Sequence, residues 1–251
     1  MNEVIKQLKN RRSVREFTGE KVKEEDLKLI LETAQRYPNS NHAQQTSLIV
    51  IRDRETIKKI AELSGGQKQI ETADVFILIL IDYYRGGYAA NSIGNKHFGP
   101  KSADGILVGA VDAGIMLATI QTAAEALGYG TTAIGGLRLN PEILTEMFNL
   151  PEYVFPILGT TIGVPQENKL KSSKPRVPFE SFAFDDGYDT EKVKKGVDKF
   201  QEIYEEWKDK NNLNSLPSYK ENVSNAYKQI RYNKTKSVME KQGFEFTDDE
   251  K

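Results

Sequence analysis

The feature that most constrains the fold of this 251-residue chain is an apolar segment at residues 102–127. Aliphatic residues occupy most of the circumference of the helix that it predicts, so the helix belongs in the middle of a domain or in a subunit interface. Gly105, Gly109 and Gly114 would let a neighbouring element approach closely. The polar flanks and the interior Asp112 argue against insertion of this helix into a membrane.

Shorter patterns predict a sheet with helices around it. Continuous aliphatic runs of strand length, typical of strands buried on both faces, lie at residues 47–51 and 75–81, and residues 155–164 form another apolar strand candidate. Apolar residues at helical spacing predict helices at about residues 4–8, 24–34, 57–63, 140–149, 189–207 and 219–241. After residue 165 the chain becomes polar and proline-rich, and the two late helices have no strand between them.

The bulk composition excludes several classes of function. Thirty-five basic and 36 acidic residues leave a net charge of −1, so the chain has no overall field to attract nucleic acid or a membrane surface. The absence of cysteine excludes disulfides, thiolate metal sites and thiol redox chemistry, and two histidines are too few for a histidine metal site. Any redox activity must therefore come from a cofactor. With neither a signal peptide nor a transmembrane run, we expect a soluble, cytoplasmic protein.

A basic cluster, Arg11-Arg12-Ser13-Val14-Arg15, lies between the first predicted helix and a turn. Guanidinium groups offer paired donors that match phosphate oxygens, and a serine hydroxyl can fill a remaining acceptor. The cluster therefore favours a bound phosphate dianion. The alternative, a solvated basic turn, is common for short arginine runs.

A possible nucleotide loop, Gly128 to Ala133, matches G-x-G-x-x-A, but a predicted helix precedes it and a strand follows it. The Rossmann fingerprint requires the reverse order, so we reject this reading. Four other polar groups each also have a purely structural explanation as a cap, helix stop, bend or solvated loop: Asn39-Ser40-Asn41-His42, Gly65-Gly66-Gln67, Ile134-Gly135-Gly136 and Lys174-Pro175-Arg176.

In their order and spacing these motifs resemble the nitroreductase superfamily, in its NADPH-dependent flavin reductase branch, from about Ile5 to Pro178. The resemblance implies an α+β fold with a central, mostly antiparallel sheet flanked by helices. It also implies an intertwined homodimer with a helical C-terminal arm and one FMN at each of two interface sites. The expected division is an FMN-binding core at residues 1–180 and an extension at residues 181–251 that packs on the core or on the partner subunit.

The same resemblance assigns roles to individual residues. The FMN phosphate and part of the ribityl chain would be held by Arg11, Arg12, Ser13, Val14, Arg15, Lys174 and Arg176. The pyrimidine half of the ring would face Asn39 and Gln67, with Ser40 and Asn41 beside them. The segment under the ring would be Ala133, Ile134, Gly135 and Gly136, where a backbone N–H can reach the flavin N5.

The activity implied is two-electron, ping-pong hydride transfer through flavin N5, from NADPH or NADH to planar oxidants such as flavins, quinones or nitroaromatics. No side chain need act as a catalytic nucleophile, and no metal is expected. Two alternatives stay open: an FMN enzyme of the same fold with another reaction, such as reductive dehalogenation or flavin remodelling, and a non-enzymatic flavin-binding interaction module.

Three positions depart from the family pattern. Arg11 stands where histidine is frequent, and His42, a candidate substrate-binding residue, stands where close relatives carry an aromatic residue such as phenylalanine. The arginine-rich arm that binds the NADPH 2′-phosphate is not evident, and Lys208 is its candidate substitute. We therefore expect a weaker preference for NADPH than is usual in this branch.

Overall fold

The computed structural model describes residues 1–170 and 172–248. Their contacts form two compact units, one of residues 1–170 and 232–248 and the other of residues 172–231. The domain boundary expected after residue 180 stays a prediction.

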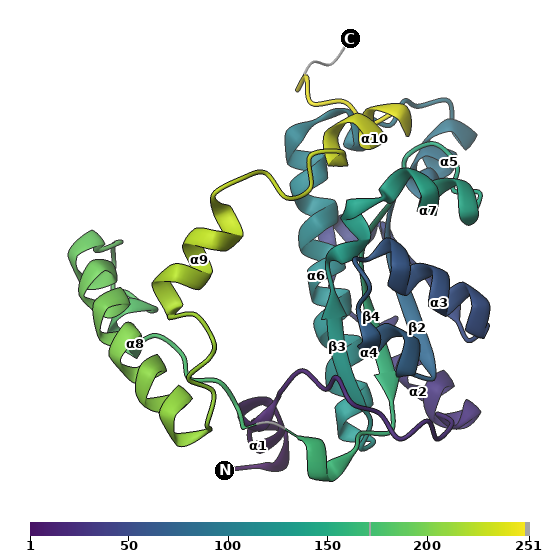
Figure 1. Ribbon diagram of the computed structural model, residues 1–251. Helices are drawn as coiled ribbons and strands as arrows, with labels where there is room; N and C mark the ends of the chain where they lie inside the picture. The colour runs from purple at the N-terminus through teal and green to yellow at the C-terminus, as the bar shows by residue number, and fades with distance from the viewer. Residues whose placement is uncertain (171, 249–251) are drawn as a thin grey trace. The chain divides into compact units, whose positions relative to one another are not determined.

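The first unit contains one four-stranded sheet, labelled in Figure 1. Its strands are β1 (Thr46–Ile51), β2 (Val75–Asp82), β3 (Gly130–Ile134) and β4 (Val154–Gly163). The order is β1-β2-β4-β3, and each neighbouring pair is antiparallel. The predicted α+β class with an antiparallel sheet is therefore confirmed, and β1 and β3 form the two edges of the described sheet.

Both units contain helices, and those of the first unit surround the sheet. The helices of the first unit are α1 (Glu3–Asn10), α2 (Glu24–Ala34), α3 (Arg54–Leu63), α4 (Lys68–Thr72), α5 (Tyr84–Ser92), α6 (Ala103–Ala126), α7 (Pro141–Met147) and α10 (Thr235–Lys241). Short 3₁₀ turns in this unit are η1 (Ser40–His42), η2 (Gly99–Lys101), η3 (Gly136–Leu139) and η4 (Glu167–Lys169). The second unit contains η5 (Phe179–Ser181), α8 (Thr190–Lys210) and α9 (Tyr219–Tyr227).

The central strand β2 is buried on both faces, as its aliphatic run predicts. Val75, Ile77 and Ile79 point to one face and pack in a cluster with residues of α2 and α6. The intervening residues, from Phe76 to Leu80, point to the other face and pack with α3, α4 and α7. Because side chains alternate along a strand, residues of β2 pack into hydrophobic clusters on both faces of the sheet. Each buried aliphatic side chain contributes about 1.5–3 kcal/mol to the stability of the fold.

The predicted central helix is confirmed as α6, whose N-cap Ser102 accepts a hydrogen bond from the Gly105 N–H at 2.9 Å. α6 has the length and hydropathy of a membrane span, a property that the core helix of a globular protein shares. Its inner side reaches the sheet, where a Cβ on Gly109 would lie 2.8 Å from Ile81 Cγ2. Its other side exposes Leu107 and Val111, at 65% and 60%.

The predicted single helix over residues 219–241 is wrong. α9 ends at Tyr227, and α10 begins again at Thr235 in the other compact unit. The reason is tertiary: Val238 and Met239 of α10 are buried in a cluster with Phe155 and Phe244, whereas α9 has no buried residue. The predicted helix beginning after Asp189 is confirmed, and this residue caps α8 by accepting from the Glu191 and Lys192 N–H groups.

Candidate functional site

The arginine segment is held on the β3 edge of the sheet. The Val14 N–H donates to Thr131 O at 2.8 Å, and the Thr132 hydroxyl donates to Val14 O. Gly130 allows this approach, because a Cβ there would lie 2.7 Å from Val14 Cβ. Val14 is buried and Arg15 is exposed. The sequence therefore anchors the segment through its apolar residue, next to the exposed Arg15.

A cavity of 210 Å³ opens beside Arg11 and Arg12, and Glu125 also lines it. Burial raises the pKa of Glu125, while the Thr131 hydroxyl and the two guanidinium groups act to lower it. The hydroxyl donates to Glu125 Oε1 at 2.9 Å. The cationic cluster thus has a carboxylate beside it, and a bound dianion would compete with that carboxylate for the guanidinium groups.

At the other end of β3, the Gly135-Gly136 bend meets the turn that carries Gln67. A Cβ on Gly136 would lie 2.5 Å from Ser64 O and 2.6 Å from Gln67 Nε2, so only glycine fits. The Gln67 amide donates to Ser64 O at 3.0 Å and accepts from Gln69 Nε2 at 2.8 Å. The structure therefore brings together two predicted groups that are 69 positions apart in the sequence.

Arg138 and Tyr232 lie beside the same bend, although the sequence analysis did not select them. The Arg138 guanidinium stacks 4.7 Å from the centre of the Tyr232 ring, and its Nη1 donates to Ile157 O at 2.6 Å. A Cβ on Gly135 would lie 3.4 Å from Arg138 Nη2 and 3.8 Å from the tyrosine hydroxyl. Nothing in the sequence links residues so far apart, so this contact required the tertiary structure.

The Asn39–His42 segment lies at the opposite edge, where the chain enters β1. Asn41, His42 and Gln44 all have left-handed backbone, with φ of 54°, 56° and 53°. Each such residue costs about 1–2 kcal/mol, which contacts with its surroundings must offset. Local bonds help, since Asn39 Oδ1 accepts from the Gln44 N–H at 2.9 Å. Three strand spacings, about 14 Å, separate the edges to which this segment and the arginine segment attach.

Asp112 of α6 ties this segment to the core, a role that the sequence analysis missed. It is 3% exposed, and the Ser40 N–H lies 3.3 Å from each of its carboxylate oxygens. Oδ2 also accepts from Gln45 Nε2 at 2.9 Å. Burial raises the pKa of Asp112, and the two donors act in the opposite direction. In the sequence, Asp112 is only a charge within an apolar helix.

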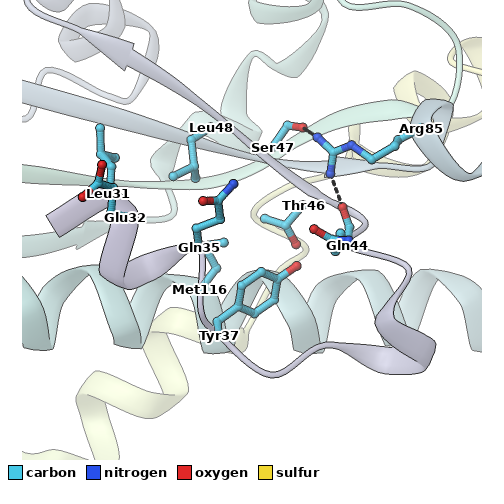
Figure 2. Close-up of a pocket in the computed structure, with 10 residues that line it drawn as sticks. All are labelled: Leu31, Glu32, Gln35, Tyr37, Gln44, Thr46, Ser47, Leu48, Arg85 and Met116. Carbon is cyan, nitrogen blue, oxygen red and sulfur yellow. Dashed lines mark hydrogen bonds between the residues drawn. The ribbon is translucent and has the colours of Figure 1, made fainter. Parts of the chain in front are cut away.

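A larger cavity of 570 Å³ lies next to this segment, between α2, β1 and α6 (Figure 2). Leu31, Leu48 and Met116 supply apolar walls, and Arg85 donates to Gln44 O and, at 2.9 Å, to Ser47 Oγ. Of the described residues that line it, none is a predicted cofactor ligand. The described residues also contain no cluster of three or more histidine or acidic side chains suited to a metal ion.

Three residues predicted to bind a phosphate or a nucleotide lie in the second unit: Lys174, Arg176 and Lys208. Arg176 donates to its neighbours Lys174 O and Pro175 O, at 2.8 and 3.0 Å. Lys208 has a side chain only 6% exposed, and its ammonium binds Leu216 O at 3.0 Å and Glu205 at 2.7 Å. The Lys208 ammonium is therefore already engaged within its own unit. The roles of these residues toward a phosphate or a nucleotide stay predictions.

Comparison with known proteins now places the chain. The model of the family described as "Nitroreductase family" matches residues 8–164, and "Nitroreductase family, C-terminal domain" matches residues 174–247. The chain belongs to the nitroreductase family. This family member is 38% identical over 247 residues to "FMN reductase [NAD(P)H]" of Bacillus subtilis (strain 168), covering 97% of the chain and 98% of that relative.

Further similarities extend over nearly the whole chain. "CR(VI) reductase" of Pseudomonas sp. (strain G-1) is 32% identical over 238 residues, covering 94% of the chain and 97% of the relative. The solved structure of B. megaterium NfrA2 superposes with a TM-score of 0.93 at 36% identity, covering 98% of this chain and 99% of that one. The resemblance and fold predicted from the motifs are confirmed, and the family implies a flavin cofactor.

Proposed function

We propose that this nitroreductase family member is an FMN-dependent NAD(P)H oxidoreductase that reduces flavins, quinones or nitroaromatics. The observation that carries the proposal is the arrangement along β3, with the arginine segment bound at Thr131 and the glycine bend with Gln67 beyond Ile134. The 38% identical relative, named "FMN reductase [NAD(P)H]", also supports this proposal.

The residues present fit FMN, which has a phosphate at one end, a ribityl chain and a ring at the other. From Gly130 to Ile134 the strand spans about 13 Å, which suits an extended ligand of this kind. Arg11, Arg12 and Arg15, with the Ser13 hydroxyl, supply charged and neutral donors for a dianion. At the far end, two successive glycines let a flat ring approach the backbone.

When bound, FMN supplies two-electron hydride chemistry at N5 of its ring. We assign three groups of the chain a task toward it. The arginine segment would neutralise the phosphate, and the Gln67 amide, whose position is fixed by Ser64 O and Gln69, would hydrogen-bond the pyrimidine edge. The backbone N–H at Gly136 would hydrogen-bond the ring near N5, and nucleotide and oxidant would bind in turn at one shared site, so the kinetics would be ping-pong.

We further propose that a second copy of the chain completes each site. Asn39–His42 lies at the β1 edge, away from the β3 edge, so a partner subunit would bring this segment to the ring. The exposed Leu107 and Val111 on the apolar α6 provide a surface for that partner. In this arrangement Asn39, with Ser40 and Asn41 beside it, would lie against the pyrimidine half of the ring, and His42 would face the planar substrate.

The visible spectrum of the purified protein, recorded under argon before and after addition of NADPH or NADH, tests this proposal. We expect oxidised-flavin bands that either nucleotide bleaches, with efficiencies that differ by less than about 100-fold, or roughly 2.7 kcal/mol. Light scattering should give a mass of two chains. Bound flavin that neither nucleotide reduces would favour another reaction on the same fold, whereas a protein that stays colourless after incubation with FMN would refute the flavin assignment.

A further inference from the structure

We propose that Asp112 is a positioning residue that sets the Asn39–His42 segment against the flavin and the planar substrate. The inference rests on the proposed function, because it assumes that this segment faces the ring. Asp112 itself is buried in the α6 layer and would touch neither cofactor nor substrate. It acts through two donors, the Ser40 N–H and the Gln45 side chain.

The geometry explains why such a residue is needed. The segment contains two non-glycine residues in left-handed backbone, Asn41 and His42, followed shortly by a third, Gln44. Residues in this region of φ persist only where their surroundings hold them. The two donors to Asp112 flank these residues, one before them and one after them, so a single carboxylate fixes both ends of the strained stretch.

A carboxylate suits this task better than a neutral acceptor. Its oxygens accept at the same time from a backbone N–H and a side-chain amide, and hydrogen bonds to a charged acceptor are about twice as strong as neutral ones. An amide at this position would turn its own NH₂ group toward one of the two donors. Substitution Asp112→Asn therefore keeps the shape of the side chain but replaces one attraction with a contact between two donors.

The experiment compares three holoenzyme variants by steady-state kinetics with a quinone and with a nitroaromatic, and by near-UV and visible circular dichroism of the bound flavin. We expect Asp112→Asn to bind FMN in full yield, yet to lose about tenfold in kcat/KM, mainly through KM for the oxidant. Gln45→Leu, which removes only one of the donors, should give a smaller loss of the same kind. Both variants should alter the circular dichroism bands of the flavin.

Gln121→Leu is the matched control. Gln121 is another buried polar residue of α6, and its Nε2 donates to Thr160 Oγ1 at 3.2 Å, away from the segment. Its loss removes a buried hydrogen bond from the same helix, so it should change the unfolding midpoint without changing KM or the flavin spectrum. This control separates general destabilisation of α6 from misplacement of the segment.

The outcomes distinguish failure of the positioning role of Asp112 from failure of the proposed function. If Asp112→Asn matches Gln121→Leu in KM and circular dichroism, the positioning role is wrong while the flavin reductase stands. If Asp112→Asn does not fold, Gln45→Leu decides alone, since an unchanged KM and flavin spectrum in that variant would overturn the inference. A wild-type protein that binds no flavin refutes the proposed function itself.

Discussion

The two edges of the sheet are shaped by different means. At the β3 edge, backbone approaches backbone: Gly130 lies against Val14, and Gly136 lies against Ser64 and Gln67. At the β1 edge, a strained segment is held by buried side chains, Asp112 and Gln45. The β3 edge depends on glycines, which have no Cβ to clash with the neighbouring chain. The β1 edge depends on hydrogen bonds to a buried carboxylate. The edges should therefore respond differently to substitution.

The β3 edge should fail by steric conflict. A methyl group at Gly136 would lie 2.5 Å from a backbone oxygen, which cannot rotate away, so in Gly136→Ala the bend or the Gln67 turn must move. Because overpacking of this kind costs about 1–3 kcal/mol, we expect FMN affinity to fall by about 10- to 100-fold. Fluorescence titration of the apoprotein with FMN measures this loss.

Gly87→Ala is the control for that substitution. Gly87 lies in α5, and a Cβ there would meet no atom within 4 Å. Alanine favours a helix over glycine by about 0.5–1 kcal/mol, so this variant should be as stable as the wild type or more stable, with unchanged FMN affinity. Equal affinity in the Gly136 and Gly87 variants would show that the bend is not where the ring binds.

The arginine segment offers a narrower test of the same edge. Arg15 is exposed next to the anchored Val14, so Arg15→Ala removes a guanidinium without opening a cavity in the core. If it binds the phosphate, FMN affinity should fall about 30-fold, in the range of a charge-assisted hydrogen bond. Riboflavin lacks the phosphate, and its affinity should not change. A similar loss for both ligands would place Arg15 away from the phosphate.

The sequence predicts those parts of the molecule that local patterns determine. The aliphatic run of β2 and the apolar circumference of α6 specify burial directly, and the order of helix, Gly128 and strand excludes a Rossmann loop. At Asn140-Pro141, the predicted helix start is also confirmed. These signals need no knowledge of distant residues, because each rests on spacing within one element.

The contacts that build the site are of another kind. The sequence suggests a tight bend at Gly136, but only the fold shows that Gln67 fills the space beside it. In the sequence Asp112 is an isolated charge, and only the structure shows that the Ser40 N–H, 72 positions away along the chain, contacts it. The break between α9 and α10 likewise follows from burial of Val238, which local helical spacing does not reveal.

A second buried carboxylate sharpens the contrast between positioning and stability. Asp74 is 3% exposed and binds the Val22 N–H, Lys21 and Arg52 at 2.8–2.9 Å, at the end of the sheet where β2 begins. Asp74→Asn keeps the shape but loses the charge, so unfolding free energy should fall by about 2 kcal/mol. FMN affinity and KM should not change, in contrast to Asp112→Asn. Urea denaturation measures the first effect.

The pH dependence of the unfolding free energy shows whether the Asp74 carboxylate stabilises the fold. Burial acts to raise the pKa of Asp74, but Lys21, the Val22 N–H and Arg52 together outweigh it and hold the pKa below its usual range. A carboxylate with a lowered pKa stabilises the fold above its unfolded-state pKa, near 3.8, and this contribution is lost as pH falls through the folded-state value. The difference between wild type and Asp74→Asn should therefore be constant from pH 7 to 5 and shrink below pH 4.

Glu62→Gln completes this comparison, because it removes an exposed carboxylate whose partner Lys59 lies 3.4 Å away. Exposed pairs contribute about 0–1 kcal/mol, so little change is expected at any pH. If Asp74→Asn were as mild as Glu62→Gln, the ion pairs around Asp74 would contribute no more than a surface pair. If Asp74→Asn instead raised KM for the oxidant, as Asp112→Asn is expected to, that result would contradict the distinction between a stabilising and a positioning carboxylate, because loss of either charge would then disturb the site through the sheet.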